Sequence, residues 1–500
     1  MDHDAPGAGR VPAVTMNTHS ENQLFVGGEW RSARSTARIE VENPYARTLV
    51  GVAPDGSFDD VDAAVGAARA AFDHGPWPRM SAHERAGFLL RLADELERRG
   101  ESTAGIVTDE VGQPIEFSRF VNIALPAQHL RYFAELIGDF PFEQRRSNVS
   151  GPGTSVVRLE PVGVAGLIAP WNYPQSILSA KLAPALAVGC TVVVKPAGET
   201  PLDALALAAA VEAVGFPPGV VNVVTGGRET GDALVNHPGV DKIAFTGSTA
   251  AGRIIARNCA ERLIPVTLEL GGKSAAIVAE DADIDVTLAA LRAGAFMNSG
   301  QTCFLLSRVI VPRTRKDELL DGLVELARSF RLGDPRDPAT DMGPLVSERI
   351  RTRVRTMVDD ARSEGAQILT GGRDLPGERG YFYEPTIVAG VAADSQIARE
   401  EVFGPVVSVF EYDGIEDAIA LANDSRYGLG GAVFSTDPAA ALDVARAVQT
   451  GTIGVNGYAP DLATPFGGYK ESGLGREQGT EVLYNYVHTK AINTSIGQSV

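Results

Sequence analysis

The sequence predicts an α/β protein built from two doubly wound α/β lobes and a small β arm. From Val164 onward, short β-rich runs alternate with stretches long enough for crossover helices, and a second alternating series begins at about Ser274. Such alternation predicts mostly parallel sheets, with ligands at the carboxyl ends of the strands. Two segments, 139–161 and 484–500, fit neither series, and their extended-looking sequence suits an arm that pairs with another subunit.

Bulk composition limits the class of protein. The chain has 500 residues, 44% of them hydrophobic, which is ordinary globular composition. Its formal net charge of −18 repels phosphate backbones, so we expect no nucleic-acid partner. No apolar run approaches the roughly 20 residues of a membrane helix, so we expect no membrane partner. Residues 1–20 lack the basic start and apolar stretch of a signal peptide, which predicts a disordered tail and a cytoplasmic protein.

The cysteines and histidines give no sign of a metal site. The three cysteines are odd in number and widely spaced, and the seven histidines are scattered. Neither a disulfide scaffold nor a C-x-x-C or H-E-x-x-H metal motif can be built from them. We therefore expect no metal.

The first lobe is predicted to open with two helices. Residues 59–73 are Ala-rich with spaced apolar positions, and 81–99 begin with a capping box from Ser81 to Glu84 and stop before Gly100. The strands expected next are 164–169, 191–195, 220–224, 241–245 and 264–270. The helices expected between them are 174–189, 201–214, 229–236 and 248–260.

The second lobe repeats this pattern after a helix-like stretch at 283–297. Its expected strands are 307–312, 405–411 and 430–435. Its expected helices are 314–330, 347–364, 414–423 and 439–450. It ends in the Gly-rich segment 465–475.

Cys303 is the first candidate for chemistry. A free cysteine has a pKa of about 8.5, yet its small thiolate fraction is a strong nucleophile. Because Cys303 follows 283–297 and a glycine-containing break at 300–301, we expect a loop whose backbone N–H groups stabilise the thiolate and a later oxyanion. The alternative is a buried structural thiol, which is our interpretation of Cys190 and Cys259.

Glu269 is the second candidate. It lies between two leucines at the end of a strand, directly before two glycines. Partial desolvation there would raise the pKa of the carboxyl and make it a better proton acceptor near neutrality. The alternative is an edge-strand glutamate that faces water. The following Gly-Lys-Ser resembles the tail of a P-loop, but Thr267 stands where that motif requires glycine.

Three other strand ends carry candidates for ligand contacts. Asn172, in PWNYP, is a neutral amide donor just after a strand, or else a turn residue. Residues 246–252 lead into a helix whose free backbone N–H groups could bind a pyrophosphate. The alternative is that these residues only cap the start of the helix. Lys195 ends a predicted strand and could donate to ribose or phosphate oxygens. The alternative is a lysine that only exposes its charge to water at the end of that strand.

Taken together, these segments resemble the NAD(P)-dependent aldehyde dehydrogenase superfamily. The resemblance runs from about Leu24 to about Lys490. Eight segments match in the family's order: PWNYP (170–174), VVVKPA (192–197), FTGS (245–248), LELGGKS (268–274), GQTC (300–303), EEVFGPV (400–406), GVNG (454–457) and PFGGYKESGLGRE (465–477). Eight ordered matches form a highly specific signal.

The resemblance implies that the chain oxidises a small-molecule aldehyde to a carboxylic acid. In this role Cys303 attacks the carbonyl, Asn172 and the Cys303 backbone N–H hold the oxyanion, and Glu269 activates water to hydrolyse the thioester. The implied cofactor is NAD, with NADP as an alternative. The implied cofactor-binding residues are Trp171, Lys195, Gly231, Gly247, Ser248, Gly252, Leu270, Glu401 and Phe403.

The resemblance also implies a domain organisation. We expect a disordered tail at 1–20, a dinucleotide-binding domain at 21–138 and 162–273, a catalytic domain at 274–483, and an oligomerisation arm at 139–161 and 484–500. With such an arm, the chain is expected to form a homodimer or homotetramer.

Three positions depart from the common family pattern. Gly198 stands where NAD-preferring relatives often carry a glutamate that repels a 2′-phosphate, which leaves room for NADP+ unless Glu199 substitutes. Ile350 stands where a glutamine often contacts ribose. Phe304 follows the nucleophile where smaller residues are frequent, so it shapes the substrate tunnel.

Two other functions compete with aldehyde oxidation to an acid. A CoA-acylating enzyme would pass the thioester to CoA, but such relatives typically lack the equivalent of Glu269. A non-catalytic protein with the same fold would not need the combination of Cys303, Glu269 and Asn172. The aromatic residues Tyr173, Phe304 and Phe466 favour an apolar aldehyde over a charged one.

Overall fold

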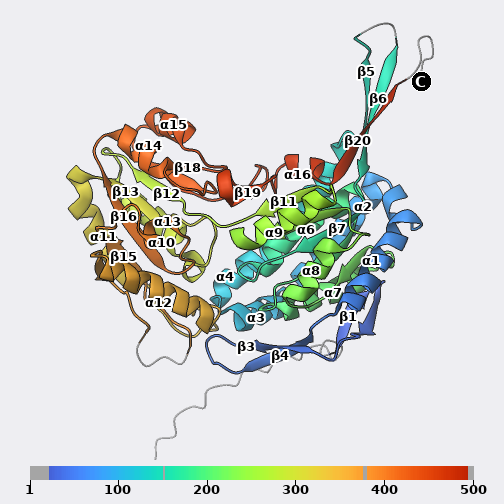
Figure 1. Cartoon of the computed structure of the whole chain (residues 1–500), viewed down its shortest axis with the longest axis horizontal. Helices are drawn as coiled ribbons and strands as arrows, with labels where there is room; N and C mark the ends of the chain where they lie inside the picture. Colours follow the sequence, from blue (N-terminus) through green and yellow to red (C-terminus); the bar gives the residue numbers. More distant parts are fainter. Residues whose placement is uncertain (1–21, 150–152, 376–379, 494–500) are drawn as a thin grey trace, which may run out of the picture.

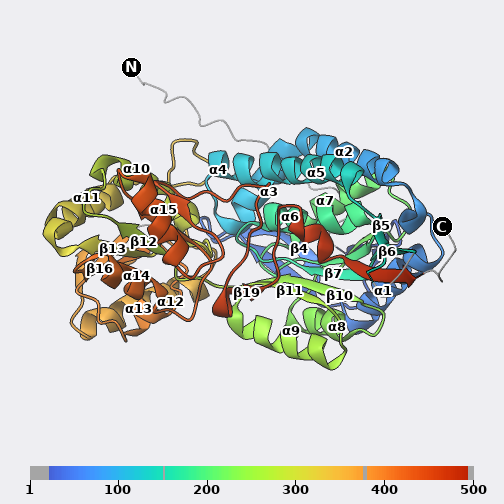
Figure 2. The same ribbon diagram turned by 90° about the horizontal axis from the view of Figure 1, so that it is seen from above.

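The computed structural model describes residues 22–149, 153–375 and 380–493. Two α/β lobes lie side by side, and a small three-stranded sheet projects from the first lobe (Figures 1 and 2). This arrangement confirms the predicted fold class. The predicted tail at 1–20 and the last residues of the predicted arm, 494–500, lie outside the described residues.

The first lobe is organised around an eight-stranded sheet. Its strand order is β19-β11-β10-β7-β8-β9-β1-β2, with parallel pairing from β11 to β9 and antiparallel pairing at both edges. The strands are β1 (Gln23–Val26), β2 (Glu29–Ser32), β7 (Val164–Ile168), β8 (Thr191–Lys195), β9 (Val221–Val223), β10 (Lys242–Thr246), β11 (Val266–Glu269) and β19 (Gly473–Leu474). A separate hairpin pairs β3 (Arg38–Glu42) with β4 (Leu49–Pro54).

Helices cover both faces of this sheet, so its central strands are buried on both sides. Along β8, Val192 and Val194 face one apolar cluster, whereas Val193 faces the other. This alternation follows from the two-residue period of a strand, and burial of both faces explains its unbroken apolar sequence. The helices are α1 (Phe58–Asp73), α2 (Ala82–Arg98), α3 (Gly100–Val111), α4 (Ile115–Arg119), α5 (Leu125–Leu136), α6 (Pro174–Val188), α7 (Pro201–Val214), α8 (Arg228–Asn236) and α9 (Thr249–Glu261).

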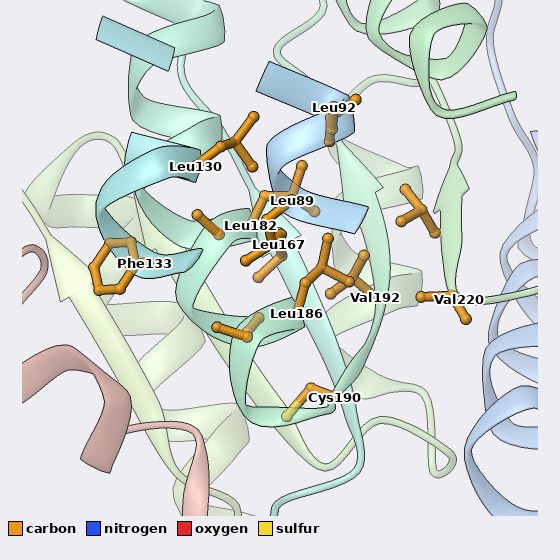
Figure 3. Packing of buried hydrophobic residues seen from close by; sticks show 14 of the residues in the cluster. Leu89, Leu92, Leu130, Phe133, Leu167, Leu182, Leu186, Cys190, Val192 and Val220 are labelled. Atoms are coloured by element: carbon orange, nitrogen blue, oxygen red, sulfur yellow. The ribbon is translucent and has the colours of Figure 1, made fainter. Parts of the chain in front are cut away.

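Two of the three cysteines belong to these cores. Cys190 belongs to the same apolar cluster as Leu182, Leu186 and Val192 and lies at its lower edge in Figure 3; burial raises the pKa of its thiol to about 12. Cys259 is buried on the inner side of α9. Both thiols pack as small apolar groups, as the sequence predicts.

The second lobe has a seven-stranded sheet in the order β14-β15-β16-β13-β12-β17-β18. Its strands are β12 (Ala275–Val278), β13 (Arg308–Pro312), β14 (Gln367–Thr370), β15 (Thr386–Ala389), β16 (Val406–Tyr412), β17 (Gly431–Phe434) and β18 (Gly454–Val455). Its helices are α10 (Ile284–Phe296), α11 (Lys316–Arg328), α12 (Glu348–Ser363), α13 (Gln396–Arg399), α14 (Ile415–Asn423) and α15 (Pro438–Ala447). All pairs between β15 and β18 are parallel.

The small sheet joins two segments that lie far apart in the sequence. Strands β5 (Glu143–Ser147), β6 (Thr154–Pro161) and β20 (Val487–Asn493) pair antiparallel, with β6 in the middle. Just before β20, β19 adds an edge strand to β11 of the first sheet, and α16 (Glu481–Tyr484) contacts α6. The chain thus returns from the second lobe to the first before it ends (Figure 1).

The strands and helices predicted between residues 164 and 260 are all present, and no boundary differs by more than one residue. The region 100–136 is different, because its patterns did not indicate α3, α4 or α5. There a left-handed Gly112 ends α3, and α4 passes through a π-helical turn, Phe120–Ala124, into α5. Such interruptions break the simple helical period on which the prediction relies.

Candidate functional site

The first sheet reverses its winding direction at β7. Strands β8 and β9 follow β7 on one side, whereas β10 and β11 lie on the other. In a doubly wound sheet, the strand ends at such a reversal leave a crevice in which ligands bind. The loop after β7 carries Trp171 and Asn172, and the loop after β10 carries Gly247 and Ser248. The topology therefore brings these four residues to one place.

Cys303 approaches this place from the second lobe, in a loop that follows α10 as predicted. The backbone of Asn298 and Ser299 is left-handed, with φ of 53° and 55°, a conformation that non-glycine residues adopt only when their surroundings enforce it. Gly300 follows at φ 78°, and a Cβ there would lie 2.0 Å from the carbonyl carbon of Gly404. Only glycine fits this turn, which fixes the path of the chain just before the thiol.

A cavity of about 290 Å³ brings residues of both lobes together. Predicted site residues that line it are Trp171, Asn172, Gly247, Ser248, Leu270, Cys303, Glu401 and Phe403. Its other lining residues are Pro170, Thr246, Gly271, Arg349, Ile350 and Arg353. A thiol, an amide and a carboxyl group thus face one space beside a helix N-terminus.

Asn172 is almost fully buried, with 4% of its surface exposed. Its side-chain Nδ2 donates to the carbonyl of Gln301 at 2.9 Å. A primary amide has two N–H groups, so this bond leaves one for a ligand in the cavity. Asn172 is therefore a fixed donor next to Cys303.

Glu401 lies on the other side of the cavity. Its Oε1 accepts from the backbone N–H of Gly272 at 3.1 Å. Burial raises the pKa of this carboxyl to about 7, although the Gly272 N–H and the charges of Arg353 and Lys273 act to lower it. The ring of Phe403 meets that of Trp171 edge to face at 5.4 Å, and together they form an aromatic wall.

Glu269 ends β11 and has only 3% of its surface exposed. Neither of its carboxylate oxygens has a hydrogen-bond partner within the described residues. Burial raises its pKa well above 4.5, and the neighbouring charge of Glu477 raises it further, whereas Lys181 and Arg476 lower it. Glu269 does not line the 290 Å³ cavity, but its charge acts on the Cys303 thiol. It is thus a desolvated carboxyl near the Cys303 thiol, not the water-facing glutamate of the alternative.

A buried ion pair accounts for part of this effect. Lys181 of α6 is fully buried; its Nζ contacts Glu477 and donates to the hydroxyl of Thr246 at 2.6 Å. A charge this deep in a protein requires such partners. The pair therefore places one positive and one negative group within the electrostatic reach of Glu269.

The resting thiol of Cys303 is neutral. Burial raises its pKa, and the carboxylates of Glu401 and Glu269 raise it further. The backbone N–H groups of Cys303 and Phe304 act in the opposite direction, as the sequence suggested, but they do not outweigh the burial. Formation of the thiolate therefore requires a base or a change in these surroundings.

A second cavity, of about 360 Å³, adjoins the first at Ser248. Lys195 and Gly231 line it, together with residues of α8 and α9. Burial lowers the pKa of Lys195 to about 8, and Glu199 and Asp55 act to raise it. Gly252 lines neither cavity; a Cβ there would lie 2.5 Å from Leu270, so this glycine lets α9 pack closely.

Comparison with known proteins agrees with this geometry. The model of the aldehyde dehydrogenase family matches residues 30–492. The chain belongs to the aldehyde dehydrogenase family. It is 46% identical over 475 residues to a geranial dehydrogenase from Castellaniella defragrans, covering 95% of this chain and 99% of that one. It is 40% identical over 476 residues to aldehyde dehydrogenase family 2 member C4 from Arabidopsis thaliana, covering 94% of each.

Solved structures of aldehyde dehydrogenases share the fold of this chain. The Mycobacterium tuberculosis aldehyde dehydrogenase complexed with NAD+ superimposes with a TM-score of 0.94 at 43% identity, over 96% of this chain and 99% of that one. These comparisons confirm the family resemblance seen in the sequence.

The two adjoining cavities of this aldehyde dehydrogenase fit a dinucleotide. Ser248, which lines both cavities, caps α9 through its side chain, which accepts from the Ala251 N–H, and Ala250 and Ala251 of the first turn line the second cavity. A helix N-terminus binds phosphate through its free backbone N–H groups. A Cβ at Gly247 would lie 2.5 Å from the Phe245 ring, which is consistent with a close backbone turn there.

The three departures from the family pattern have structural consequences. An added Cβ at Gly198 would meet no atom within 4 Å, so space is open there. Glu199 pairs with Arg349 at 3.3 Å. Ile350 lines the cavity with an apolar surface. Phe304 packs edge to face against two other aromatic rings, those of Tyr458 at 5.4 Å and Phe466 at 6.0 Å.

Several residues around the site were not named individually from the sequence, although Gln301 lies in the matched GQTC segment. Gln113, Asn298 and Gln301 make buried amide contacts around Asn172, and their partners lie far away in the sequence. Lys181 does leave a signal, since it is a lone charge in the apolar stretch ILSAKLAPALAV. Such a residue in a buried helix requires a partner, although the sequence does not say which.

Within the described residues, no group of three or more His, Cys, Asp or Glu side chains is placed to hold a metal ion. None of the described helices is long and apolar enough to cross a membrane.

Proposed function

We propose that this aldehyde dehydrogenase uses NAD+ to oxidise an apolar aldehyde to a carboxylic acid through a thioester on Cys303. The observation that carries the proposal is the convergence of Cys303, Asn172 and Glu401 on one cavity, beside the capped start of α9. The NAD+ complex of the 43% identical M. tuberculosis enzyme supports the choice of cofactor.

The first step joins the aldehyde to the protein. The Cys303 thiol gives its proton to a water molecule in the cavity, its sulfur attacks the carbonyl carbon, and the C=O electron pair moves to the oxygen. The free N–H of the Asn172 amide and the backbone N–H of Cys303 hold this oxyanion. Fixed donors aimed at a developing charge are typically worth about 10²–10³ in rate each.

When bound, NAD+ supplies the acceptor for the hydride that leaves the tetrahedral carbon. The residues assigned to it divide into three groups. Glu401, Phe403 and Trp171 would hold the nicotinamide end, and Gly247, Ser248 and Leu270 would line the pyrophosphate region. Gly252 would contribute to that region indirectly, by letting α9 pack closely against Leu270. Lys195 and Gly231 would contact the adenosine end. Because the space at Gly198 is open and Glu199 is paired with Arg349, NADP+ is an alternative cofactor.

The final step releases the acid. Glu269 takes a proton from water, the resulting hydroxide attacks the thioester carbon, and the C–S bond breaks to return Cys303. A carboxyl with a raised pKa suits this task, because it is a stronger base than an ordinary glutamate, and no group among the described residues hydrogen-bonds to its two oxygens. The same feature favours water over CoA as the acceptor of the acyl group.

Other parts of the proposal concern organisation. The three-stranded arm of β5, β6 and β20 would pair with another subunit in a homodimer or homotetramer. The first lobe and the second would serve as dinucleotide-binding and catalytic domains, with boundaries at 21–138, 162–273 and 274–483. We place the protein in the cytoplasm.

The aromatic cluster of Phe304, Tyr458 and Phe466 supports an apolar substrate. A second aromatic pair is formed by Phe117 of α4 and Tyr173, which directly precedes α6; their ring centroids lie 6.0 Å apart. The name of the 46% identical geranial dehydrogenase makes geranial the first aldehyde to test.

The test is a panel of purified-enzyme assays. Geranial, straight-chain aldehydes, benzaldehyde and a charged aldehyde are each incubated with NAD+ or NADP+, with and without CoA. We expect reduced cofactor and free carboxylic acid in equal amounts, fastest with apolar aldehydes and unchanged by CoA. Acyl-CoA as the product, or no cofactor reduction with any aldehyde, would overturn the proposal.

A further inference from the structure

A chain of buried amide groups leads from helix α3 to the backbone of Asn172. Asn172 lies in the bend between β7 and α6, and its carbonyl oxygen accepts from Gln113 Nε2 at 2.6 Å. The same oxygen also accepts from Asn298 Nδ2 at 3.0 Å. A carbonyl has two lone pairs, so these two side chains occupy both.

The far end of this chain fixes which way Gln113 points. Asn122 Nδ2 donates to Gln113 Oε1 at 2.9 Å and to Ser118 Oγ at 3.1 Å. Ser118 Oγ in turn donates to the carbonyl of Ala104 in α3 at 3.0 Å. Because the amide oxygen of Gln113 is taken by Asn122, its nitrogen must face Asn172.

The backbone around Gln113 is shaped for this contact. Gly112 ends α3 in the left-handed conformation, and a Cβ there would lie 2.7 Å from Pro344. Asn122 belongs to the π-helical turn between α4 and α5, a rare element that often marks functional sites. Gln113 and Asn122 are 1% and 3% exposed, so water does not compete for their hydrogen bonds.

We propose that Gln113 is a positioning residue for Asn172: it fixes the Asn172 backbone so that the side-chain amide meets the oxyanion. This inference rests on the proposed function, in which Asn172 stabilises the oxyanion. Asn298 holds the same carbonyl from the nucleophile loop, so Asn172 is clamped between the two lobes. Gln113 itself lies outside the cavity and does not contact the reacting atoms.

The test compares two variants. Gln113→Met keeps the side-chain volume but cannot hydrogen-bond, and Gln113→Glu, assayed at a pH at which its carboxyl is ionised, still accepts from Asn122 but cannot donate to Asn172. We expect the burst of cofactor reduction to slow by roughly 10- to 100-fold in both, since a donor displaced by about 1 Å can lose that much. The KM for the aldehyde should change less than about threefold, because the oxyanion exists only after attack.

The matched control is Gln175→Met. Gln175 is an equally buried amide on α6, but it donates to Asp203 rather than to Asn172. Its burst rate should stay within about threefold of wild type even if its stability falls, as mutations that spare the site usually affect only folding. Alkylation of Cys303 by iodoacetamide at the wild-type rate shows in each variant that the nucleophile loop is intact.

A double-mutant cycle decides whether Gln113 acts through Asn172. Asn172→Ala alone should slow the burst by about 10²–10³. The variant with both Asn172→Ala and Gln113→Met should then be no more than about twofold slower than Asn172→Ala, because the positioned group is already gone. If the rate loss of the double variant equalled the product of the two single losses, the positioning role would be refuted. It would also be refuted if Asn172→Ala were slow but Gln113→Met gave a burst at the wild-type rate. A wild-type rate for Asn172→Ala would instead refute the oxyanion role in the proposed function.

Discussion

Replacing Glu269 by glutamine tests the division of labour in the proposed mechanism. The amide has nearly the volume of the carboxyl, and in the part of the chain that the structure describes neither carboxylate oxygen has a hydrogen-bond partner that the change would break. We therefore expect the free energy of unfolding at pH 7 not to fall, because the variant also lacks a carboxyl whose pKa is raised by burial. What the substitution removes is the ability to accept a proton from water.

The rates give the expected magnitude. General base catalysis is typically worth about 10²–10⁴ in rate, so hydrolysis of the thioester should slow by at least about 100-fold. This corresponds to roughly 2.7 kcal/mol or more in the activation free energy. Attack by Cys303 and hydride departure do not use this base in our scheme, so the first turnover should remain fast.

The assay is stopped-flow absorbance of the reduced cofactor. The variant should show a burst of about one equivalent per active site, followed by a slow steady state, and mass spectrometry should detect the acyl group on Cys303. Wild-type steady-state turnover would refute the assignment of Glu269 as the base for hydrolysis. A slow first turnover with no burst would show that Glu269 acts earlier, on the thiol itself.

The pH dependence of stability offers a second measure of the same group. Burial raises the pKa of Glu269 above its unfolded value of 4.5, so the folded chain binds more protons between these two pKa values. Wild-type stability should therefore decline as pH rises through this window, and the glutamine variant should lose that part of the decline. Identical pH slopes in urea unfolding would contradict the raised pKa.

Three further predictions concern other sites. Cys303→Ala should abolish cofactor reduction, and residual turnover above about 1% of wild type would exclude Cys303 as the nucleophile. Gly198→Glu should lower kcat/KM for NADP+ relative to NAD+ by at least about tenfold, because the open space would receive a carboxylate that repels a 2′-phosphate. Gly198→Gln controls for side-chain size. An equal shift in both variants would show that charge repulsion is not the cause. His129→Gln should reduce the loss of unfolding free energy that wild type shows as pH falls. Burial lowers the pKa of His129 to about 4 from 6.5, so below pH 6.5 the unfolded chain gains a proton first, and wild type should lose up to about 3 kcal/mol by pH 4. Urea unfolding at pH 7 and pH 4.5 measures this difference, and equal losses in both proteins would contradict it.

The sequence by itself determined the fold class, most of the strands and helices in the first lobe, and the family. These depend on local patterns: the period of apolar residues, caps such as Ser81 with Glu84, and short motifs such as GQTC. The same patterns named Cys303, Glu269 and Asn172 as candidates, because each is a reactive or polar residue at a strand end or after a helix.

Only the tertiary structure decided how these groups act on one another. Glu269 has a raised pKa because burial and Glu477 penalise its charge. The resting Cys303 is neutral because burial raises the pKa of its thiol and carboxylates from both lobes raise it further. Gln113 meets Asn172 across 59 positions of sequence. Local patterns do not encode such encounters, since burial, charge and hydrogen bonding depend on distances that only the folded chain defines.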